Sequence, residues 1–170
     1  PYARLRPRSQ TASHTPRYME NHRSPPAAQA SGRCKPLALR LFDIDFFKSI
    51  NDPYGHDAGD DVLREFAVRI RKSIRGIDLA CRYGGEEFVI VMPETDLTVA
   101  GMVAERLRRS IAGETFAVNK GTKRIDVTIS IGLATLDRKG EPVADVLKRA
   151  DTALYRAKHD GRNRVVSAAA

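Results

Sequence analysis

Few cysteines and no long hydrophobic run limit what this sequence can be. Cys34 and Cys81 are the two cysteines among its 170 residues, too few for a disulfide framework and without the spacing of a metal site. Cys81 lies in a predicted strand, where we expect a small core residue. No stretch provides the roughly 18–20 apolar residues of a membrane span, and no signal peptide is recognisable. These absences predict a cytoplasmic protein in a reducing environment, with no direct membrane span.

An aromatic run along a predicted strand is also missing. Sheets that bind single-stranded RNA expose such aromatic side chains, so we do not expect a nucleic acid as the partner. The chain begins at Pro1 rather than at methionine, and we take it to be a piece of a longer protein.

The basic charge is concentrated at the N-terminus. The chain has 29 basic and 21 acidic residues, and residues 1–33 hold six arginines against the single acid Glu20. This segment is rich in Pro, Ser, Ala and Arg and has no apolar periodicity, so we predict a largely disordered tail. A basic tail could touch nucleic acid or an acidic membrane, but a solvated linker is the preferred interpretation. The remainder, with a small positive excess, suits a polyanionic nucleotide.

Residues 34–170 are predicted to form one α+β domain. Apolar periodicity predicts strands at 37–42, 79–81, 88–92, 115–118, 124–132 and 164–166, and helices at 46–51, from 56–61 through 74, at 96–111 and at 143–158. A turn is expected at 52–55 and a left-handed helix cap at Gly161. In the helix at 96–111, the expected buried stripe is Val99, Val103, Leu107 and Ile111.

A glycine pair followed by two acids marks a candidate site. Gly84 and Gly85 join two short apolar strands, as in a hairpin whose tight turn needs glycine at positive φ. Glu86 and Glu87 follow directly. Because alternate residues of a strand point to opposite faces, one of these acids should lie over a cleft, although a solvated acidic turn would have the same sequence.

A second acidic site lies upstream. The apolar run 37–42 ends in Asp43, Ile44 and Asp45, and strand ends are where sites form in layered α/β folds. Carboxylates on neighbouring strand ends can share divalent cations, because Mg²⁺ prefers carboxylate and phosphate oxygens. The two acidic sites together predict metal-assisted phosphoryl chemistry.

The run Gly84-Gly85-Glu86-Glu87-Phe88 resembles the signature of the GGDEF domain, the catalytic domain of bacterial diguanylate cyclases, in its GGEEF variant. The resemblance extends from about Pro36 to Val166 and is strongest to the output domains of response-regulator cyclases. It implies a central, mostly antiparallel sheet flanked by helices, of the nucleotide-cyclase and polymerase-palm type.

The resemblance also implies roles for the acids. Asp43, Glu86 and the backbone carbonyl of Ile44 would hold two Mg²⁺ ions per active site, or Mn²⁺ in their place. Glu86 and Glu87 would be the catalytic acids, with Glu87 either assisting proton transfer or stabilising charge. The alternative for each acid is a structural ion pair, and direct metal contact by Asp45 stays open.

GTP-binding residues follow from the same resemblance. Asn51 and Asp60 would read guanine, although a lone Asn or Asp before a helix is usually a cap, and His56 either lines the base pocket or makes a structural hydrogen bond. Three cations would hold the triphosphate, and two residues would offer backbone amides to phosphate; these are Lys48, Lys158 and Arg162, and Phe46 and Phe47. The alternatives are helix-end bases that compensate the dipole and core phenylalanines.

An inhibitory product site is the last feature that the resemblance implies. Arg75 and Asp78 have the RxxD spacing, with five residues between Asp78 and Gly84, and Arg106 matches a supporting arginine. An arginine and a carboxylate can grip the guanine and phosphate of cyclic di-GMP, whereas the alternative is a surface salt bridge.

The segment leading into the domain departs from the family. In place of a motif that ends in Asn-Arg-Arg, the chain has Thr11 to Arg17, with Pro16 where a helix should continue. We expect a diguanylate cyclase that joins two GTP molecules across a homodimer, driven by an upstream receiver or sensor domain and inhibited by its product. The alternative is a weak or inactive domain that serves as a receptor for cyclic di-GMP or GTP.

Overall fold

The computed structural model describes residues 36–136 and 141–168. The predicted N-terminal tail, its departing lead-in segment and Cys34 lie outside these residues, as do 137–140 and 169–170. The division into a tail at 1–33 and a domain at 34–170 therefore stays a prediction.

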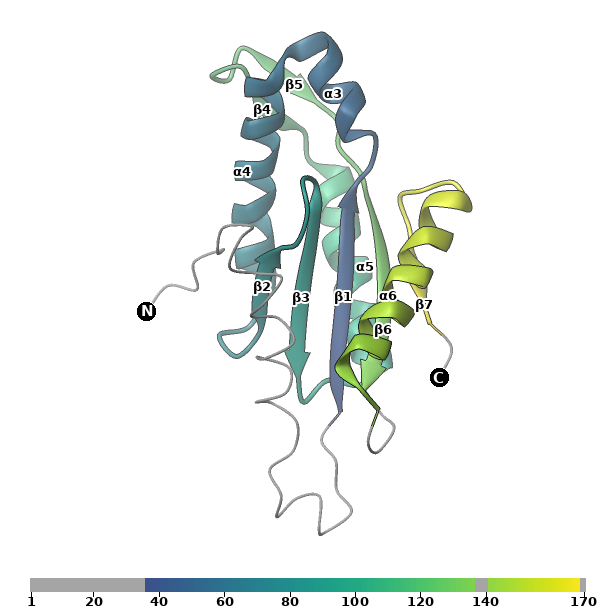
Figure 1. Cartoon of the computed structure of the whole chain (residues 1–170). Helices are drawn as coiled ribbons and strands as arrows, with labels where there is room; N and C mark the ends of the chain where they lie inside the picture. The colour runs from purple at the N-terminus through teal and green to yellow at the C-terminus, as the bar shows by residue number, and fades with distance from the viewer. Residues whose placement is uncertain (1–35, 137–140, 169–170) are drawn as a thin grey trace.

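A five-stranded sheet forms the centre of the molecule (Figure 1), in the order β2-β3-β1-β6-β7. Its strands are β1 (Leu37–Ile44), β2 (Leu79–Arg82), β3 (Glu87–Pro93), β6 (Ile129–Leu136) and β7 (Val165–Ser167). Each neighbouring pair is antiparallel except β6 and β7, which are parallel. Because β1 is central and buried on both faces, its sequence is a nearly continuous apolar run. The predicted α+β class with a mostly antiparallel sheet is confirmed.

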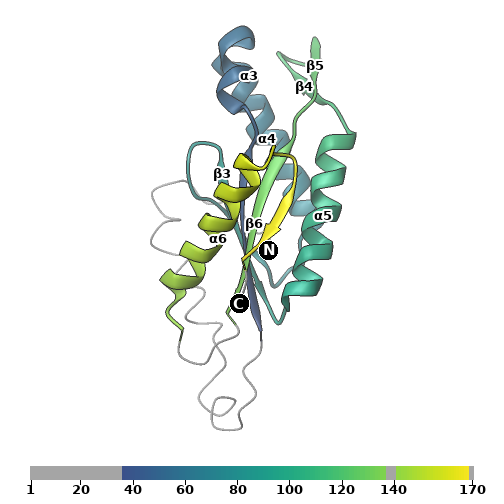
Figure 2. The same cartoon turned by 90° about the vertical axis from the view of Figure 1, so that its right-hand side faces the viewer.

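Helices cover both faces of this sheet (Figure 2). One core lies under α4 (His56–Ser73) and α5 (Leu97–Gly113), and a second core lies under α6 (Val143–His159). The short α3 (Phe47–Tyr54) follows β1 and contacts α4, beside the small sheet of β4 (Phe116–Val118) and β5 (Lys123–Ile125). The end of β1 therefore opens into the region bounded by α3, the β2–β3 hairpin and the end of α6.

The contact between α6 and β6 depends on Gly132. A Cβ atom at this position would meet the carbonyl oxygen of Ala150 and the backbone of Leu154, atoms that cannot move aside without shifting the helix. Glycine thus lets α6 lie close against the sheet, and this fixes where the C-terminal end of α6 arrives.

Three predictions about local structure are wrong. The strand expected at 124–132 is two strands in different sheets, because 126–128 carry the chain from β5 to β6, and alternation alone does not reveal a change of sheet. The turn expected at 52–55 is the end of α3, which continues through Pro53 and stops at Gly55, whose φ is 82°. On α5 the buried residues are Ala100, Ala104, Leu107 and Ile111, whereas Val99 is exposed.

Other predictions are confirmed. Cys81 is buried in β2, and Gly161 follows α6 with a φ of 113°. Within the described ranges, we find no helix with the length and apolar character needed to cross a membrane.

Candidate functional site

The β2–β3 hairpin is tight, and one of its two glycines makes room for a side chain instead of supplying the positive φ expected. The backbone N–H groups of Tyr83 and Gly84 both donate to the carbonyl of Glu87, at 2.8 and 3.1 Å. Neither Gly84 nor Gly85 has a positive φ. Instead, a Cβ on Gly84 would collide with the side chain of Glu87, whereas Gly85 has open space. The positive-φ prediction is therefore wrong, and Gly84 makes room for an acid.

A second group that shapes the hairpin is Arg82. Its guanidinium donates from Nε to the carbonyls of Gly84 and Gly85, at 3.2 and 3.1 Å, and from Nη2 to Gly85 at 2.5 Å. These bonds tie the tip of the loop to its own strand. No role was predicted for Arg82 from the sequence, although a cation directly before Tyr-Gly-Gly was a visible signal.

The hairpin brings its acids to the end of β1. Asp43 lies opposite Glu87 in the β1–β3 register, and the N–H of Ile44 points to the carbonyl of Glu86 at 3.4 Å. Asp43 is buried, and Glu86 and Glu87 are partly buried. The residues predicted to form one acidic site are thus neighbours in space, although their roles stay predictions.

One cation offsets this negative charge. Lys158, near the end of α6, pairs with Asp43, with 2.6 Å between Nζ and Oδ2. Burial raises the pKa of Asp43 to about 6; the Lys158 ammonium opposes this rise, whereas Glu86 and Glu87 add to it by repulsion. Three carboxylates around one ammonium leave an excess of negative charge that favours binding of a further cation.

The oxygen atoms at the end of β1 are a suitable donor set for a divalent metal. Within the part of the chain described, no group of three or more His, Cys, Asp or Glu side chains is arranged to hold an ion. The predicted set needs only the carboxylates of Asp43 and Glu86 and the carbonyl of Ile44, all hard oxygen donors of the kind that Mg²⁺ prefers. Burial is the main cause of the raised pKa of Asp43, and repulsion from Glu86 and Glu87 adds to it; a bound cation would offset that repulsion, so the residues fit.

Asp45 has a different environment from Asp43. It is buried, and its carboxylate accepts hydrogen bonds from Thr128 Oγ1 at 2.7 Å, Ser130 Oγ at 2.6 Å and the backbone N–H of Asn163 at 3.0 Å. These three donors use both carboxylate oxygens. Asp45 therefore joins β1 to β6 and to the loop after α6, which is a structural role. Direct metal contact by Asp45, which the sequence left open, stays untested.

The loop after α6 carries Arg162, another of the three cations predicted to bind the triphosphate. Arg162 and Asn163 both have positive φ, 62° and 44°, and Asn163 Oδ1 accepts a 2.6 Å hydrogen bond from Arg108 on α5. The Arg162 guanidinium lies over the ring of Phe46, 4.4 Å from its centroid. Two contacts on Asn163 thus fix the loop beside Arg162.

The residues predicted to contact phosphate are divided by burial. Phe46 is 62% exposed, whereas Phe47 is buried. The side chain of Phe47 is therefore a core side chain, which was the alternative considered for it, and that of Phe46 is not. Lys48 is exposed on α3. Lys158 and Arg162 lie at the same end of α6 as Asp43, as a triphosphate clamp would require.

The predicted guanine-reading residues lie where α3 meets α4. Asn51 Oδ1 is buried and has no hydrogen-bond partner among the described residues, and a Cβ on Gly59 would collide with it. Asp60 lines a cavity of about 470 Å³ between the start of α4 and the β4–β5 turn, and His56 is exposed at the first residue of α4. A buried acceptor without a donor in this position suits a polar ligand.

Arg75 and Asp78, the predicted inhibitory pair, bind each other. Arg75 Nη2 lies 2.8 Å from Asp78 Oδ1 and also donates to the Pro93 carbonyl and to Thr95 Oγ1. Hydrogen bonding to Asp78 raises the pKa of Arg75. Arg106, on α5, lines a separate groove of about 550 Å³ against α4.

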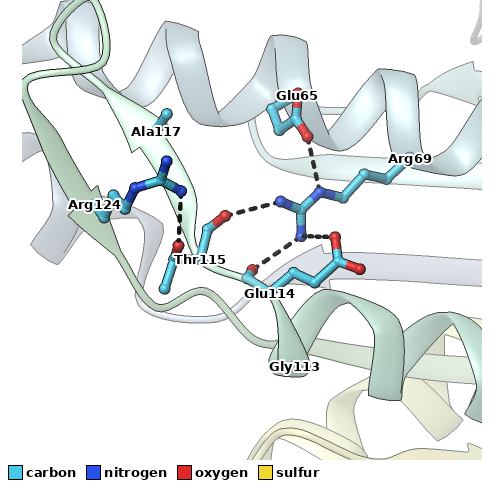
Figure 3. Close-up of a pocket in the computed structure, with 7 residues that line it drawn as sticks. All are labelled: Glu65, Arg69, Gly113, Glu114, Thr115, Ala117 and Arg124. Atoms are coloured by element: carbon cyan, nitrogen blue, oxygen red, sulfur yellow. Dashed lines mark hydrogen bonds and ion pairs between the residues drawn. The ribbon is translucent and has the colours of Figure 1, made fainter.

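A cavity of about 560 Å³ (Figure 3) adjoins the groove of Arg106, with which it shares Glu65, Arg69 and Glu114. Arg69 crosses it from α4 and binds Glu65 and the carbonyls of Glu114 and Thr115, each at 2.9 Å, while stacking on Phe116. Because its donors are already satisfied within the chain, Arg69 braces α4 against the end of α5, and the size of this cavity does not indicate a ligand site.

Comparisons with known proteins agree with this geometry. A family model described as "Diguanylate cyclase, GGDEF domain" matches residues 11–164. The response regulator PleD of Caulobacter vibrioides is 48% identical over 160 residues, 94% of this chain and 35% of PleD. Diguanylate cyclase A of Treponema denticola is 47% identical over 129 residues, 76% of this chain and 34% of that protein. The chain thus spans about a third of these curated relatives.

Solved structures show the same fold. The GGDEF domain of DgcB from Caulobacter crescentus, in complex with c-di-GMP, has a TM-score of 0.82 and 32% identity, covering 99% of this chain and 94% of that one. The active GGEEF domain of a diguanylate cyclase from Vibrio cholerae has a TM-score of 0.80 and 30% identity, covering 98% and 99%. On the family match, the sequence identities and the shared fold, this chain belongs to the GGDEF-domain family of diguanylate cyclases.

Proposed function

We propose that this domain condenses two GTP molecules into cyclic di-GMP and two pyrophosphates. The observation that carries this proposal is the acidic site at the end of β1, where Asp43 lies opposite the Glu86–Glu87 hairpin and pairs with Lys158. Carboxylates beside a lysine suit phosphoryl transfer, in which positioning and charge stabilisation supply most of the catalysis.

The reaction consists of two equivalent steps. The 3′-hydroxyl oxygen of one GTP forms a bond to the α-phosphorus of the other, the bond from that phosphorus to the bridging oxygen of the β-phosphate breaks, and pyrophosphate leaves. The hydroxyl proton goes to a carboxylate or to water. Repeating the step with the roles of the two nucleotides exchanged closes the ring.

Each predicted residue has a part in binding. Asp43, Glu86 and the Ile44 carbonyl would hold Mg²⁺, which when bound neutralises phosphate charge and acidifies the attacking hydroxyl. Lys158 and Arg162 would bind the triphosphate, and α3 would contribute Lys48. The unpartnered Asn51 Oδ1 would accept a hydrogen bond from the exocyclic amine or N1–H of guanine, next to Asp60.

A single domain cannot align two nucleotides in this way. Each domain binds one GTP, so turnover requires two copies facing each other, and holding them together turns a bimolecular encounter into an intramolecular reaction. An upstream receiver or sensor domain in a longer protein would control this pairing. Product bound at Arg75, Asp78 and Arg106 would inhibit it.

One contact favours the receptor alternative. Lys158 binds the same Asp43 carboxylate that the metal needs, and a domain in which this pair persists would bind cyclic di-GMP or GTP without turnover. The two functions make different predictions for the purified chain, because a receptor binds nucleotide and forms no product.

The experiment compares Glu86→Gln with the unchanged chain in GTP turnover with Mg²⁺, and measures GTP binding separately. Asp151→Asn is the matched control, because Asp151 is an exposed acid on α6. We expect Glu86→Gln to abolish turnover while part of the GTP binding remains, and Asp151→Asn to leave both unchanged. Unchanged turnover in Glu86→Gln would contradict the assignment of Glu86, and no turnover in the unchanged chain would favour the receptor.

A further inference from the structure

An exposed phenylalanine lies in a left-handed backbone conformation just after β1. Phe46 has a φ of 56° and a ψ of 30°, a region that bulky residues rarely adopt and that glycine adopts readily. Phe46 is 62% exposed, so burial in the core does not offset the strain of this conformation. Because backbone strain of this kind gathers at functional sites, we looked for a contact of the ring outside the core.

The ring of Phe46 contacts the guanidinium of Arg162. The Arg162 Cζ atom lies 4.4 Å from the ring centroid, within the roughly 6 Å over which an aromatic face attracts a cation. Arg162 is itself in a left-handed conformation, with a φ of 62°, and is partly buried. Two residues far apart in the sequence, both in conformations that favour glycine, thus carry side chains that stack on each other.

The main chain around Arg162 is held firmly. Its backbone N–H donates to the carbonyl of Ala157 at 2.9 Å, and the N–H of the next residue, Asn163, donates to the carboxylate of Asp45 at 3.0 Å. Two consecutive residues after β1, Asp45 and Phe46, therefore contact two consecutive residues of the loop after α6. The backbone from which the Arg162 side chain projects is fixed relative to the end of β1.

The side chain of Arg162 depends on Phe46 alone for its position. Among the described residues, no hydrogen bond or ion pair uses its guanidinium, and the ring of Phe46 is its contact. A long arginine side chain loses much conformational entropy when a ligand fixes it. Stacking occupies the face of the planar guanidinium, whereas phosphate oxygens bind to the N–H groups at its edge. The ring therefore restricts Arg162 without competing with a phosphate.

We propose that the ring of Phe46 positions Arg162, holding its guanidinium near the end of β1 with the edge directed to the phosphates of a guanine nucleotide. Phe46 is then a positioning residue that acts through Arg162, in addition to any contact of its backbone amide with phosphate. This inference rests on the proposed function, in which Arg162 binds the triphosphate.

Calorimetric titration with a GTP analogue tests this role. The analogue has a methylene group in place of the oxygen between the α- and β-phosphates, so the bond that breaks in the proposed reaction cannot be cleaved. Phe46→Leu keeps the backbone amide and the left-handed conformation but removes the aromatic face, and we expect about three- to tenfold weaker binding. Phe46→Tyr keeps that face and should bind like the unchanged chain. Equal affinity in Phe46→Leu would overturn the proposal.

A double-mutant cycle shows whether Phe46 acts through Arg162. Phe46→Leu should cause no further loss of affinity in Arg162→Met, because the ring then has no cation to hold. Equal fold-losses in both backgrounds would overturn the proposal. Tyr155→Leu is the matched control, because Tyr155 is a similarly exposed aromatic, at 60%, whose ring lies against His159. It should leave the affinity unchanged, and a loss as large as that of Phe46→Leu would also overturn the proposal.

The stack itself is measured without any ligand. In a ¹H–¹⁵N spectrum, the Nε–Hε resonance of Arg162, identified by its absence in Arg162→Lys, should shift in Phe46→Leu because the ring current is lost. An unshifted resonance would show that the two side chains do not stack.

GTP turnover by the unchanged chain separates this inference from the proposed function. If the chain binds the analogue but forms no cyclic di-GMP from GTP, the proposed cyclase activity fails, and the double-mutant cycle still decides the role of Phe46. If the chain turns over GTP and Phe46→Leu binds the analogue equally well, the inference fails alone. No binding of the analogue by the unchanged chain would overturn both.

Discussion

Replacing Asp45 by alanine should destabilise the domain, because its buried carboxylate joins β1 to β6 and to the loop after α6. The carboxylate accepts hydrogen bonds from Thr128, Ser130 and Asn163, and Ser130 is fully buried. A buried donor that loses its acceptor costs about 1–3 kcal/mol. Water can reach the partly buried Thr128 and the exposed Asn163 but not Ser130, so we expect a total loss of about 2–4 kcal/mol.

Urea unfolding of the full chain measures this loss, with Asp151→Ala as the control. Asp151 is exposed on α6, and surface substitutions of this kind usually change stability by less than about 0.5 kcal/mol. Because Asn163 is adjacent to Arg162, Asp45→Ala should also weaken GTP binding. A loss no larger than that of Asp151→Ala would refute the view that these three bonds join β1, β6 and the loop after α6.

Three further substitutions test other parts of the account. Gly132→Ala should lower the thermal unfolding temperature by an amount equivalent to about 1–3 kcal/mol, because its Cβ would meet the backbone of Ala150 and Leu154; an unchanged temperature would contradict the close approach of α6. Arg82→Met should lower GTP turnover about tenfold or more with little change in the urea midpoint, because it releases the carbonyls at the tip of the hairpin; equal turnover would contradict a positioning role. Hydrogen bonding to Arg108 lowers the pKa of Glu105 to about 2 from 4.5, so Glu105 contributes stability that is present above pH 4.5 and is lost as the pH falls towards 2. Glu105→Gln should therefore flatten the acid-side fall of the urea midpoint in that range, and an unaltered pH profile would count against this ion pair.

The sequence predicted correctly those helices and strands that are buried either along one face or on both faces. β1 is buried on both faces, so its apolar run was unambiguous, and α6 presents one regular apolar stripe. The strand at 124–132 was wrong because β5 and β6 have compatible alternation in different sheets, and which sheet a strand joins depends on distant partners. On α5, Ala100 and Ala104 lie against the sheet in place of Val99, because small residues allow the helix to approach closely.

The candidate site was predicted in part for similar reasons. The hairpin and Asp43 were recognisable because their chemistry lies in contiguous residues, and the structure brings them together through the β1–β3 register. The contact of Asn163 with Asp45, across 118 positions of sequence, could not be read from local spacing. Arg40 had a visible signal, a charge inside an apolar strand, but its complete burial depends on elements distant in the sequence.

The central claim is that this domain makes cyclic di-GMP as a pair of facing copies. The most direct test is GTP turnover with Mg²⁺ over a range of protein concentrations, with chromatographic identification of the product. We predict cyclic di-GMP and pyrophosphate, a specific activity that rises with protein concentration, and slowing as product accumulates. Absence of cyclic di-GMP at every concentration, with GTP bound, would contradict the account.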